Sequence, residues 1–245
     1  VSAGLAALPD IGLITQTEFA RQGRYLAEAV EIPVISDADT GFGAALSVER
    51  NVREVEAAGL AGLHLEDQQM PKRCGHLSGK TLVEVDEMCA KLRAAAAVKQ
   101  DSDLVIIART DARGVHDLED AIHRAHQYLE AGADWIFPEA LETPEEFEKF
   151  AQAVDAPLIA NMTEFGRSPL LSLEDLAGLG YAAVLYPVSL MRVVMKAVEA
   201  ALGTIAEEGV QTELLDLMQS RQELYELLDY SDFEERDREY FEGKK

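Results

Sequence analysis

The chain has 245 residues, 48% of them apolar, which is enough for one large hydrophobic core and lies in the size range of a single α/β barrel. Its 45 acidic residues against 22 Lys and Arg give a formal net charge of −23, which argues against a nucleic-acid partner. No apolar run approaches the roughly 20 residues of a membrane span, and no N-terminal stretch has the pattern of a signal peptide. Cys74 and Cys89 are too few for a disulfide framework, so we expect a cytoplasmic enzyme in a reducing compartment.

The acidity has two readings. An ordinary cytosolic protein can be acidic without a special reason. A protein from a high-salt source also carries a carboxylate-rich, lysine-poor surface, because such a surface stays hydrated. Composition leaves both readings open.

Short aliphatic runs alternate along the chain with stretches of helical period, at a spacing of roughly 30 residues, as in successive βα units of a parallel sheet. The runs predict strands at 32–37, 62–66, 104–110, 134–138, 157–161 and 183–186. Helices are predicted between them, among others at 47–58, 85–98, 118–131 and 144–154.

The predicted strands end in polar side chains. These are Asp37 and Asp39, Glu66 and Asp67, Arg109 and Asp111, Glu139, and Asn161. In a parallel barrel the carboxyl ends of the strands form the active-site face, so these side chains would converge there. An open doubly wound sheet would also explain the alternation, but it would gather functional groups at one switch point. The sequence therefore favours a (β/α)8 TIM barrel.

A closed barrel has eight strands, and six are predicted before the chain turns wholly helical. We therefore expect two β/α units before Val1, in a single barrel domain that includes residues 1–245. The extra C-terminal helices from about 189 carry more apolar surface than one barrel needs. We expect them to pack on neighbouring subunits of a homo-oligomer, a tetramer.

The segment Asp37-Ala38-Asp39-Thr40-Gly41-Phe42-Gly43 directly follows a predicted strand. Two carboxylates at this spacing can hold Mg²⁺, directly or through its waters, because the ion prefers oxygen ligands. A solvated Asp-Gly loop would have the same spacing. Asp10 and Glu66 add two carboxylates that could face the same ion, and four converging carboxylates need a cation. We therefore predict a site for Mg²⁺, with Mn²⁺ as an alternative, on Asp37, Asp39, Asp10 and Glu66.

The loop Lys72-Arg73-Cys74-Gly75-His76 places three cationic or titratable side chains beside a thiol. These neighbours favour the thiolate, and Gly75 lets the backbone approach a ligand closely. A lone loop cysteine is more often inert, so the interpretation depends on the neighbours. Cys89 lies in a helical pattern among apolar residues and is read as a small core side chain.

Arg109 at a strand end can bind a carboxylate through two hydrogen bonds, and Asn161 can donate to a second carboxylate or to an enolate oxygen. Arg109 and Asp111 could equally form a structural ion pair. Glu139 could tune Arg109 or orient a hydroxyl. From the residues alone these roles stay open.

Taken together and in order, these motifs resemble the isocitrate lyase/phosphoenolpyruvate mutase superfamily from about Leu8 to Phe241. The motifs are Asp37-Ala38-Asp39-Thr40-Gly41-Phe42-Gly43, Leu65-Glu66-Asp67-Gln68, Lys72-Arg73-Cys74-Gly75-His76, Ala108-Arg109-Thr110-Asp111-Ala112, Phe137-Pro138-Glu139-Ala140 and Asn161-Met162-Thr163-Glu164-Phe165-Gly166. The cysteine loop is similar to the lyase branch. Arg73 and the segment from Met218 to Glu226 resemble the methylisocitrate lyases.

The resemblance implies a lyase that splits 2-methylisocitrate into pyruvate and succinate in propionate catabolism. It implies Mg²⁺ on Asp37 and Asp39, with Asp10 and Glu66 acting through water. It places a di- or tricarboxylate substrate against Cys74, Gly75, His76, Arg109, Glu139, Asn161, Met162, Thr163, Arg192 and Arg221. Cys74 would act as the general acid, with Arg109 and Glu139 as the other catalytic residues. The family's Ser-Gly substrate loop would lie in the units expected before Val1.

Two alternatives stay open. Leu77-Ser78-Gly79 is shared in character with relatives that cleave dimethylmalate and oxaloacetate, so the substrate could be dimethylmalate, isocitrate or oxaloacetate. The second alternative is a metal-binding barrel that has lost catalysis and serves as an interaction protein. The Cys74 loop and Arg109 argue against it.

Overall fold

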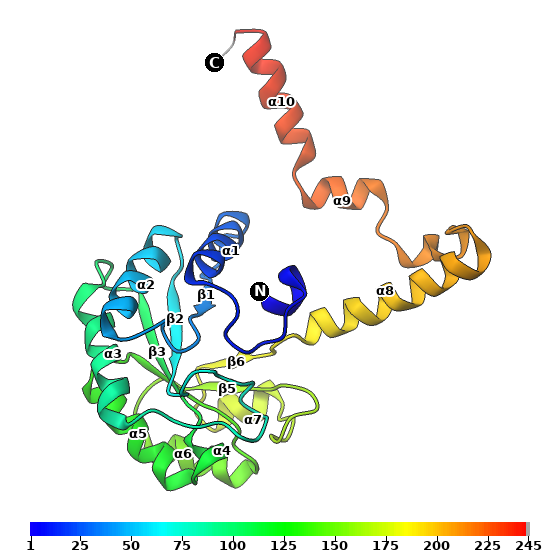
Figure 1. Cartoon of the computed structure of the whole chain (residues 1–245). Helices are drawn as coiled ribbons and strands as arrows, with labels where there is room; N and C mark the ends of the chain where they lie inside the picture. The colour runs from blue at the N-terminus through cyan, green and yellow to red at the C-terminus, as the bar shows by residue number, and fades with distance from the viewer. Residues whose placement is uncertain (244–245) are drawn as a thin grey trace. The chain divides into compact units, whose positions relative to one another are not determined.

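The computed structural model describes residues 1–243, in which helices alternate with short parallel strands (Figure 1). The chain divides into two compact units, Val1–Ser189 and the residues from Leu190 onward. The six strands of the described residues all lie in the first unit. Among the described helices, none is both long and apolar enough to cross a membrane.

The strands pair in parallel and follow the order of the chain. They are β1 (Ile35–Asp37), β2 (Gly62–Glu66), β3 (Val105–Thr110), β4 (Trp135–Pro138), β5 (Ile159–Asn161) and β6 (Ala183–Leu185). β1 to β4 form one sheet and β5 pairs with β6, while a parallel bridge between Ile136 and Leu158 links the two sets. The parallel α/β class and the six predicted strands are confirmed. A closed (β/α)8 barrel has eight strands, two more than residues 1–243 contain.

Two strands begin later than predicted, and proline explains both differences. Residues 32–34 and 157–158 lie outside β1 and β5, because Pro33 and Pro157 have no backbone N–H for the ladder. The other predicted ends differ by one residue or agree. Proline thus delays the start of a strand but leaves its carboxyl end, and therefore the site, in place.

The helices cover the outer side of the strands in the first unit (Figure 1). In chain order the helical segments are η1 (Ser2–Ala6), α1 (Gln16–Ala29), α2 (Ala45–Ala57), α3 (Val85–Val98), α4 (Ala112–Val115), α5 (Leu118–Glu130), α6 (Pro144–Ala153), α7 (Leu173–Gly178), α8 (Ser189–Glu208), η2 (Thr212–Leu217), α9 (Arg221–Leu227) and α10 (Tyr230–Phe241). Several begin at a side chain that accepts a backbone N–H, namely Thr15, Asp117, Thr143, Ser172 and Ser220. The predicted helices differ from these bounds by two residues at most.

β2 to β5 are largely buried on both faces, and each face packs into its own apolar cluster. The larger cluster lies between strands and helices and includes, from β2 and β3, Leu63, Leu65, Ile106 and Ala108. The smaller cluster comes from alternate residues of neighbouring strands, Ile107, Phe137 and Ile159. Side chains alternate along a strand, so Arg109 shares a face with Ile107 and lies one step closer to the carboxyl end. The smaller cluster therefore forms the floor beneath the polar strand ends.

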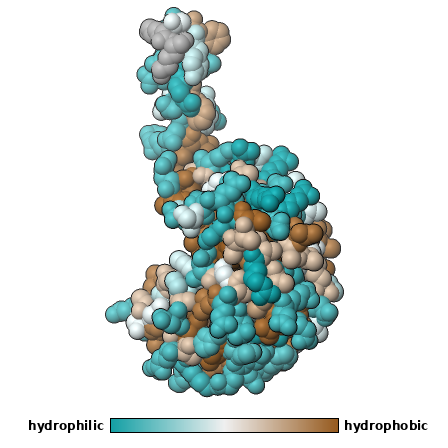
Figure 2. Space-filling model, turned by 90° about the vertical axis from the view of Figure 1, so that its left-hand side faces the viewer, coloured by the Kyte–Doolittle hydropathy of each residue, from teal (hydrophilic) through white to brown (hydrophobic). Residues whose placement is uncertain are grey.

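The C-terminal unit buries little of its own apolar surface. Among residues 190–243, Leu214 is the one buried apolar side chain, and α8 has no buried residue. Leu190, Leu217 and Phe241 are each more than 80% exposed. Figure 2 shows apolar surface interspersed with hydrophilic surface on the molecule. These exposed side chains agree with the expected packing on another subunit, which stays a prediction.

Asp67, directly after β2, ties β2 to β3 and to α5. Its fully buried carboxylate accepts hydrogen bonds from Thr110 Oγ1 at 2.8 Å and from the backbone N–H of Asp111 at 2.9 Å. From α5, the Tyr128 hydroxyl donates at 2.8 Å and Arg124 Nη1 at 3.4 Å. Burial raises the pKa of Asp67. The expectation that Asp67 joins the other strand ends is wrong, because its carboxylate faces the helix layer.

Replacing Asp67 with Ala should lower the free energy of unfolding by about 3–5 kcal/mol, because it leaves a buried guanidinium and three buried donors without their acceptor. Tyr128→Phe removes one of these bonds and should cost about 1 kcal/mol. Urea unfolding monitored by circular dichroism measures both changes. The exposed Asp155→Ala is the control and should stay within about 0.5 kcal/mol of the parent. Equal stability of Asp67→Ala and Asp155→Ala would rule out the bracing role.

Candidate active site

Polar side chains from neighbouring strands meet at the carboxyl ends of the sheet. The strand register places Asp37 level with His64, and Glu66 level with Arg109. In the next pair Arg109 lies level with Phe137. Because all these strands are parallel, the polar groups gather at one edge, above the apolar floor.

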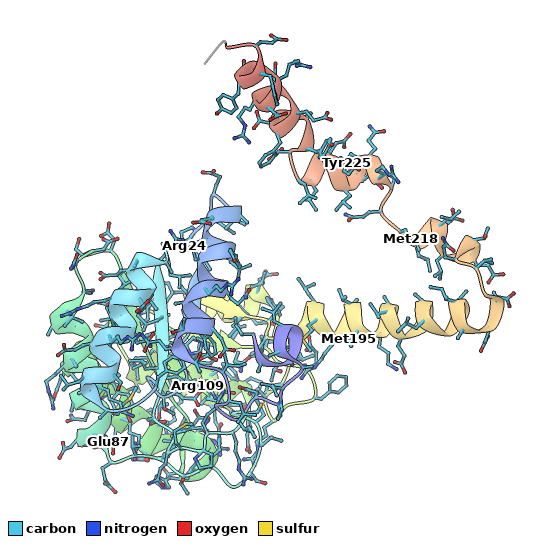
Figure 3. All side chains as sticks on the ribbon, turned by 45° about the horizontal axis from the view of Figure 1, so that its top comes forward. Arg24, Glu87, Arg109, Met195, Met218 and Tyr225 are labelled. Carbon is cyan, nitrogen blue, oxygen red and sulfur yellow. The ribbon has the colours of Figure 1, made fainter. Side chains whose placement is uncertain are left out.

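Arg109 lies at the centre of this cluster. Its Nε lies 3.0 Å from Asp111 Oδ2 and 3.5 Å from Glu139 Oε2. Its Nη1 lies 3.5 Å from Glu66 Oε2, and its guanidinium lies over the Phe137 ring at 5.3 Å. Burial alone would lower the pKa of Arg109, but the three carboxylates hold it well above its ordinary value. Figure 3 labels this side chain within the first unit. One permanent cation is thus shared by three anions.

The carboxyl end of β1 and the loop after it carry two of the predicted metal ligands. The backbone N–H of Asp39, a residue with φ of 46°, donates to Asp37 Oδ1 at 2.8 Å. The buried Asp39 carboxylate lies 2.7 Å from Lys72 Nζ, which also contacts the Asp10 carboxylate. Burial and the charge of Asp37 raise the pKa of Asp39 to about 6. The structure therefore brings Asp10 and Asp39 together on Lys72, beside Asp37.

Glu66, the fourth predicted metal ligand, is buried, and its Oε1 has no hydrogen-bond partner. Burial raises its pKa well above the ordinary value, and the opposing charge of Arg109 does not cancel the rise. Within residues 1–243, no three His, Cys, Asp or Glu side chains are arranged to hold an ion together. The carboxylates of the cluster nevertheless outnumber its cations, Lys72 and Arg109, and a hard divalent ion would neutralise the surplus negative charge. The residues present therefore fit Mg²⁺.

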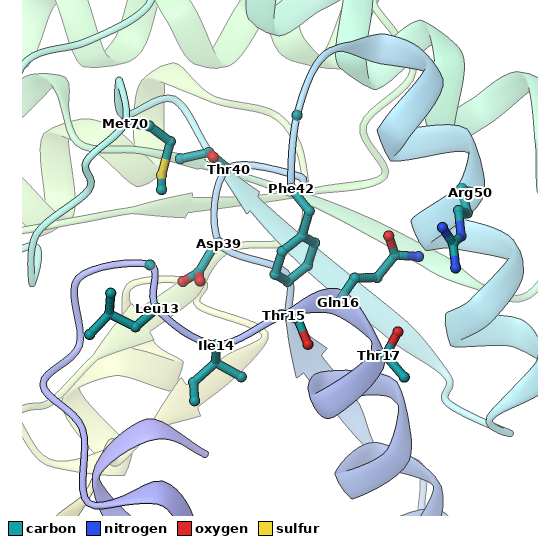
Figure 4. Close-up of a pocket in the computed structure, with 12 residues that line it drawn as sticks. Leu13, Ile14, Thr15, Gln16, Thr17, Asp39, Thr40, Phe42, Arg50 and Met70 are labelled. Carbon is teal, nitrogen blue, oxygen red and sulfur yellow. The ribbon is translucent and has the colours of Figure 1, made fainter.

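A pocket of about 530 Å³ opens beside the Asp39 carboxylate. It lies between the N-terminus of α1 and the loop after β1, and its lining includes Gln16, Phe42 and Met70. Figure 4 shows the Asp39 side chain among these residues. Water or a small ion can therefore approach Asp39 from this side.

The cysteine loop comes very close to the cluster around Arg109. A Cβ added at Gly75 would come within 2.4 Å of both the Arg109 guanidinium and the Glu139 side chain. Any side chain at this position would displace one of them, so glycine is what allows the backbone to lie there. The neighbouring Cys74 thiol is exposed, whereas Cys89 is buried in the core as predicted.

His76 connects the cysteine loop to β4 and to the loop after β5. Its Nδ1 accepts the backbone N–H of Arg167 at 2.9 Å, and its Nε2 lies 2.7 Å from Glu139 Oε1. Because Nδ1 is an acceptor, Nε2–H is the donor to Glu139. Asn161 Nδ2 donates to both carboxylate oxygens of Glu139 at 3.1 Å. Burial raises the pKa of Glu139, but Arg109 and His76 outweigh it and hold that pKa below its usual value.

The expected electropositive surroundings of Cys74 are present only in part. Lys72 is bound to carboxylates, and His76 is bound to Glu139. Arg73 is exposed, with Nη1 3.4 Å from the Ser78 carbonyl. Two of the three side chains that were expected to favour the Cys74 thiolate are therefore engaged with carboxylates.

The remaining predicted substrate residues fall into two groups. Thr163 and Met162 are buried at the end of β5, and the Met162 sulfur accepts the backbone N–H of Leu171 in the core. Arg192 and Arg221 belong to the C-terminal unit. Arg221 lines a hollow of about 450 Å³ in that unit. Contact of these four residues with a substrate stays a prediction.

Two buried side chains of the site are not singled out by the sequence motifs. His64 lies 3.5 Å from Asp37 and packs edge-on against Phe137, and burial lowers its pKa. The two-residue alternation of β2 puts His64 on the face of Glu66 and could have identified it. Lys80 lies at the far end of the cysteine loop with its side chain buried, and no spacing rule indicates it.

Comparison with known proteins agrees with this geometry. The family model described as phosphoenolpyruvate phosphomutase matches residues 1–206. A relative named probable 2-methylisocitrate lyase 2, from Corynebacterium glutamicum, is 53% identical over 98% of this chain and 78% of its own length.

Solved structures show the same fold. The crystal structure of 2,3-dimethylmalate lyase, described as a member of the phosphoenolpyruvate mutase/isocitrate lyase superfamily, superposes with a TM-score of 0.91 at 30% identity, covering 97% of this chain and 80% of that one. The structure of phosphonopyruvate hydrolase in complex with oxalate and Mg²⁺ gives a TM-score of 0.85 at 31% identity, covering 97% of this chain and 82% of that one. By sequence, fold and the order of its motifs, this chain belongs to the phosphoenolpyruvate mutase/isocitrate lyase superfamily.

Proposed function

We propose that this protein is a lyase that cleaves 2-methylisocitrate into pyruvate and succinate, a reaction of propionate catabolism. The observation that carries the proposal is the approach of the Cys74 loop to Arg109 and Glu139, at the ends of parallel strands. A proton donor, a carboxylate-binding cation and an ionised carboxylate then face one space. The relative named 2-methylisocitrate lyase supports this choice of substrate.

The proposed reaction is a retro-aldol cleavage. A base removes the proton of the C2 hydroxyl, the O–H electron pair becomes the new C=O bond of pyruvate, and the C2–C3 pair stays on the succinate carbon. That carbon takes a proton from the Cys74 thiol, and the base returns its proton to the thiolate through solvent. Glu139 lies beside Arg109 and His76 at the strand ends, and it is the carboxylate that we propose accepts the hydroxyl proton directly or through water. Arg109 binds a carboxylate of the substrate.

Mg²⁺ is the proposed cofactor, with Mn²⁺ as an alternative. Asp37 and Asp39 would hold the ion, and Asp10 and Glu66 would act through its waters. When bound, the ion would supply positive charge to the oxygens of the substrate. The unpaired Glu66 oxygen and the surplus of carboxylates support this choice.

We further propose a cytoplasmic homotetramer whose subunits are single barrel domains that include residues 1–245. The apolar side chains exposed on the C-terminal helices support contacts between subunits. Cleavage of 2,3-dimethylmalate is the second candidate, because the lyase for that acid shares the fold over 97% of this chain.

A comparison of substrates tests the choice between these acids. Phe137 and Leu185 belong to the apolar floor beneath Arg109, where they would contact the methyl group of the substrate. One methyl group in an apolar pocket changes specificity by roughly 10- to 200-fold, so kcat/KM should be lower by this factor for isocitrate than for 2-methylisocitrate. With Mg²⁺ present, release of succinate, the product common to both acids, is the measurement, and dimethylmalate and oxaloacetate are assayed in parallel by their own products. Equal efficiency with isocitrate would show that this floor does not select the methyl group.

Asp39→Ala should abolish both turnover and the rise in melting temperature that Mg²⁺ produces, because a ligand stabilises only a protein that binds it. Thermal unfolding with Mg²⁺ and with a chelator measures the second effect without any substrate. The exposed Asp155→Ala is the matched control and should retain both properties. Full activity of Asp39→Ala in the presence of chelator would refute the metal assignment.

Cys74→Ser should lower kcat by about 10²- to 10⁴-fold, the usual contribution of a general acid, and leave KM within a few fold. The reason is that serine is a much weaker acid, while Arg109 remains available to bind the substrate. Cys89→Ser makes the same atomic change in the core and should leave kcat intact. Steady-state kinetics of the two variants tests the role of Cys74 as general acid. Near-normal turnover of Cys74→Ser would show that the thiol has no part in the reaction.

A further inference from the structure

We propose that Lys80 is a positioning residue that fastens the cysteine loop to Asp111, so that Cys74 is held over the site and Arg109 stays available to the substrate. The part that concerns catalysis rests on the proposed function. The part that concerns the loop rests on the structure alone.

The Lys80 ammonium has two partners from two segments. Its Nζ lies 2.7 Å from Asp111 Oδ1, and it donates a hydrogen bond to the backbone carbonyl of Gly75. The Lys80 side chain is 1% exposed and that of Asp111 is fully buried. Lysine is rarely buried unless it is paired, so these two contacts account for the position of the ammonium.

The contact with Gly75 fixes the backbone next to the catalytic thiol. Residues 77–79, between the ends of the loop, are exposed, and Gly79 with φ of +80° turns the chain so that Lys80 points back inside. Releasing the Gly75 carbonyl would remove the contact that fixes the backbone between the bonds of Arg73 to Gln68 and those of His76 to Arg167 and Glu139. A displacement of about 1 Å at a reacting group can cost roughly 10²-fold in rate.

The contact with Asp111 adjusts the charge that Arg109 experiences. Asp111 Oδ2 lies 3.0 Å from Arg109 Nε, and Asp111 Oδ1 accepts from Arg109 Nη2 at 3.2 Å as well as from Lys80. Without Lys80, the full charge of Asp111 would act on Arg109, which already neighbours Glu66 and Glu139. The guanidinium would then attract a substrate carboxylate less strongly, so KM should rise.

The test compares Lys80→Met, which keeps the length of the side chain without its charge, with Lys80→Arg, which keeps the charge. Lys80→Met should lower kcat by about 10²-fold and raise KM, and Lys80→Arg should restore part of both. Trypsin cleavage of the Arg73–Cys74 bond, followed by mass spectrometry in the absence of substrate, should be faster in Lys80→Met than in the parent. This second measurement reports release of the loop whatever the substrate is.

Lys99→Met is the matched control. Lys99 also joins a backbone carbonyl and a carboxylate, those of Leu104 at 3.0 Å and Asp134 at 3.1 Å, but it does so near the amino ends of β3 and β4. Its loss should leave kcat, KM and the cleavage rate at Arg73 unchanged. A change in these three quantities equal to that of Lys80→Met would show a general effect on stability and overturn the proposal.

A double variant separates loop release from misfolding. Lys80→Met leaves the buried Asp111 with one cation fewer, and Asp111→Asn in the same chain removes that uncompensated charge. The double variant should fold as stably as the parent and still be cleaved faster at Arg73, because the Gly75 carbonyl has lost its donor. Cleavage at the parental rate would overturn the proposal. If the parent turns over none of the four acids, the proposed function fails, while the cleavage result still decides the role of Lys80 in the loop.

Discussion

The site depends on one buried guanidinium shared by three buried carboxylates. Taking charges out of water is expensive, and the cost is recovered only when each charge has partners of good geometry. Asp111 has a second cation in Lys80, and Glu139 has His76 and Asn161 as donors. Glu66 is the exception, because one of its oxygens has no partner. The deficit of positive charge thus lies on the side of the cluster where Asp37 and Asp39 enter, which is where a metal ion would neutralise it.

The same constraint joins the cysteine loop to the chemistry. Three residues of one short segment supply groups that the cluster needs: the Lys72 ammonium, the His76 N–H and the Lys80 ammonium. When this segment lies in place, the buried charges are compensated and Gly75, next to Cys74, lies against Arg109. When it moves away, several carboxylates lose their donors at once. The position of this segment and the compensation of the buried charges are therefore linked.

Sequence patterns predicted the fold well because the fold depends on local and repetitive signals. Alternating strands and helices, and prolines before β1 and β5, are visible in the chain itself. The gathering of Asp37, Glu66 and Arg109 also follows from the rule that parallel strands end at one edge. The orientation of single side chains was harder to predict. The sequence around Asp67 does not indicate that its carboxylate turns toward Tyr128 and away from the site.

Pairings between loops were beyond sequence reasoning for a different physical reason. The partner of a long flexible side chain is set by three-dimensional approach, so Lys72 near Cys74 suggested an activated thiol whereas its ammonium binds Asp10 and Asp39. Lys80 shows the same limit, since its partner Asp111 is 31 residues away.

A few cations of this acidic chain lie in its interior. Three of its eight lysines, Lys72, Lys80 and Lys91, are buried, and Lys91 donates to the Thr40 carbonyl in the loop after β1. All three lie near the carboxyl ends of the strands. Buried carboxylates, those of Asp39, Glu66, Asp67, Asp111 and Glu139, offset these buried cations, so the surface keeps the acidic character of the whole chain. Salt screens exposed charges more effectively than buried pairs. The exposed charges of this protein consequently affect its solubility, whereas the buried charges position the catalytic groups. Ionic strength acts mainly on the exposed charges.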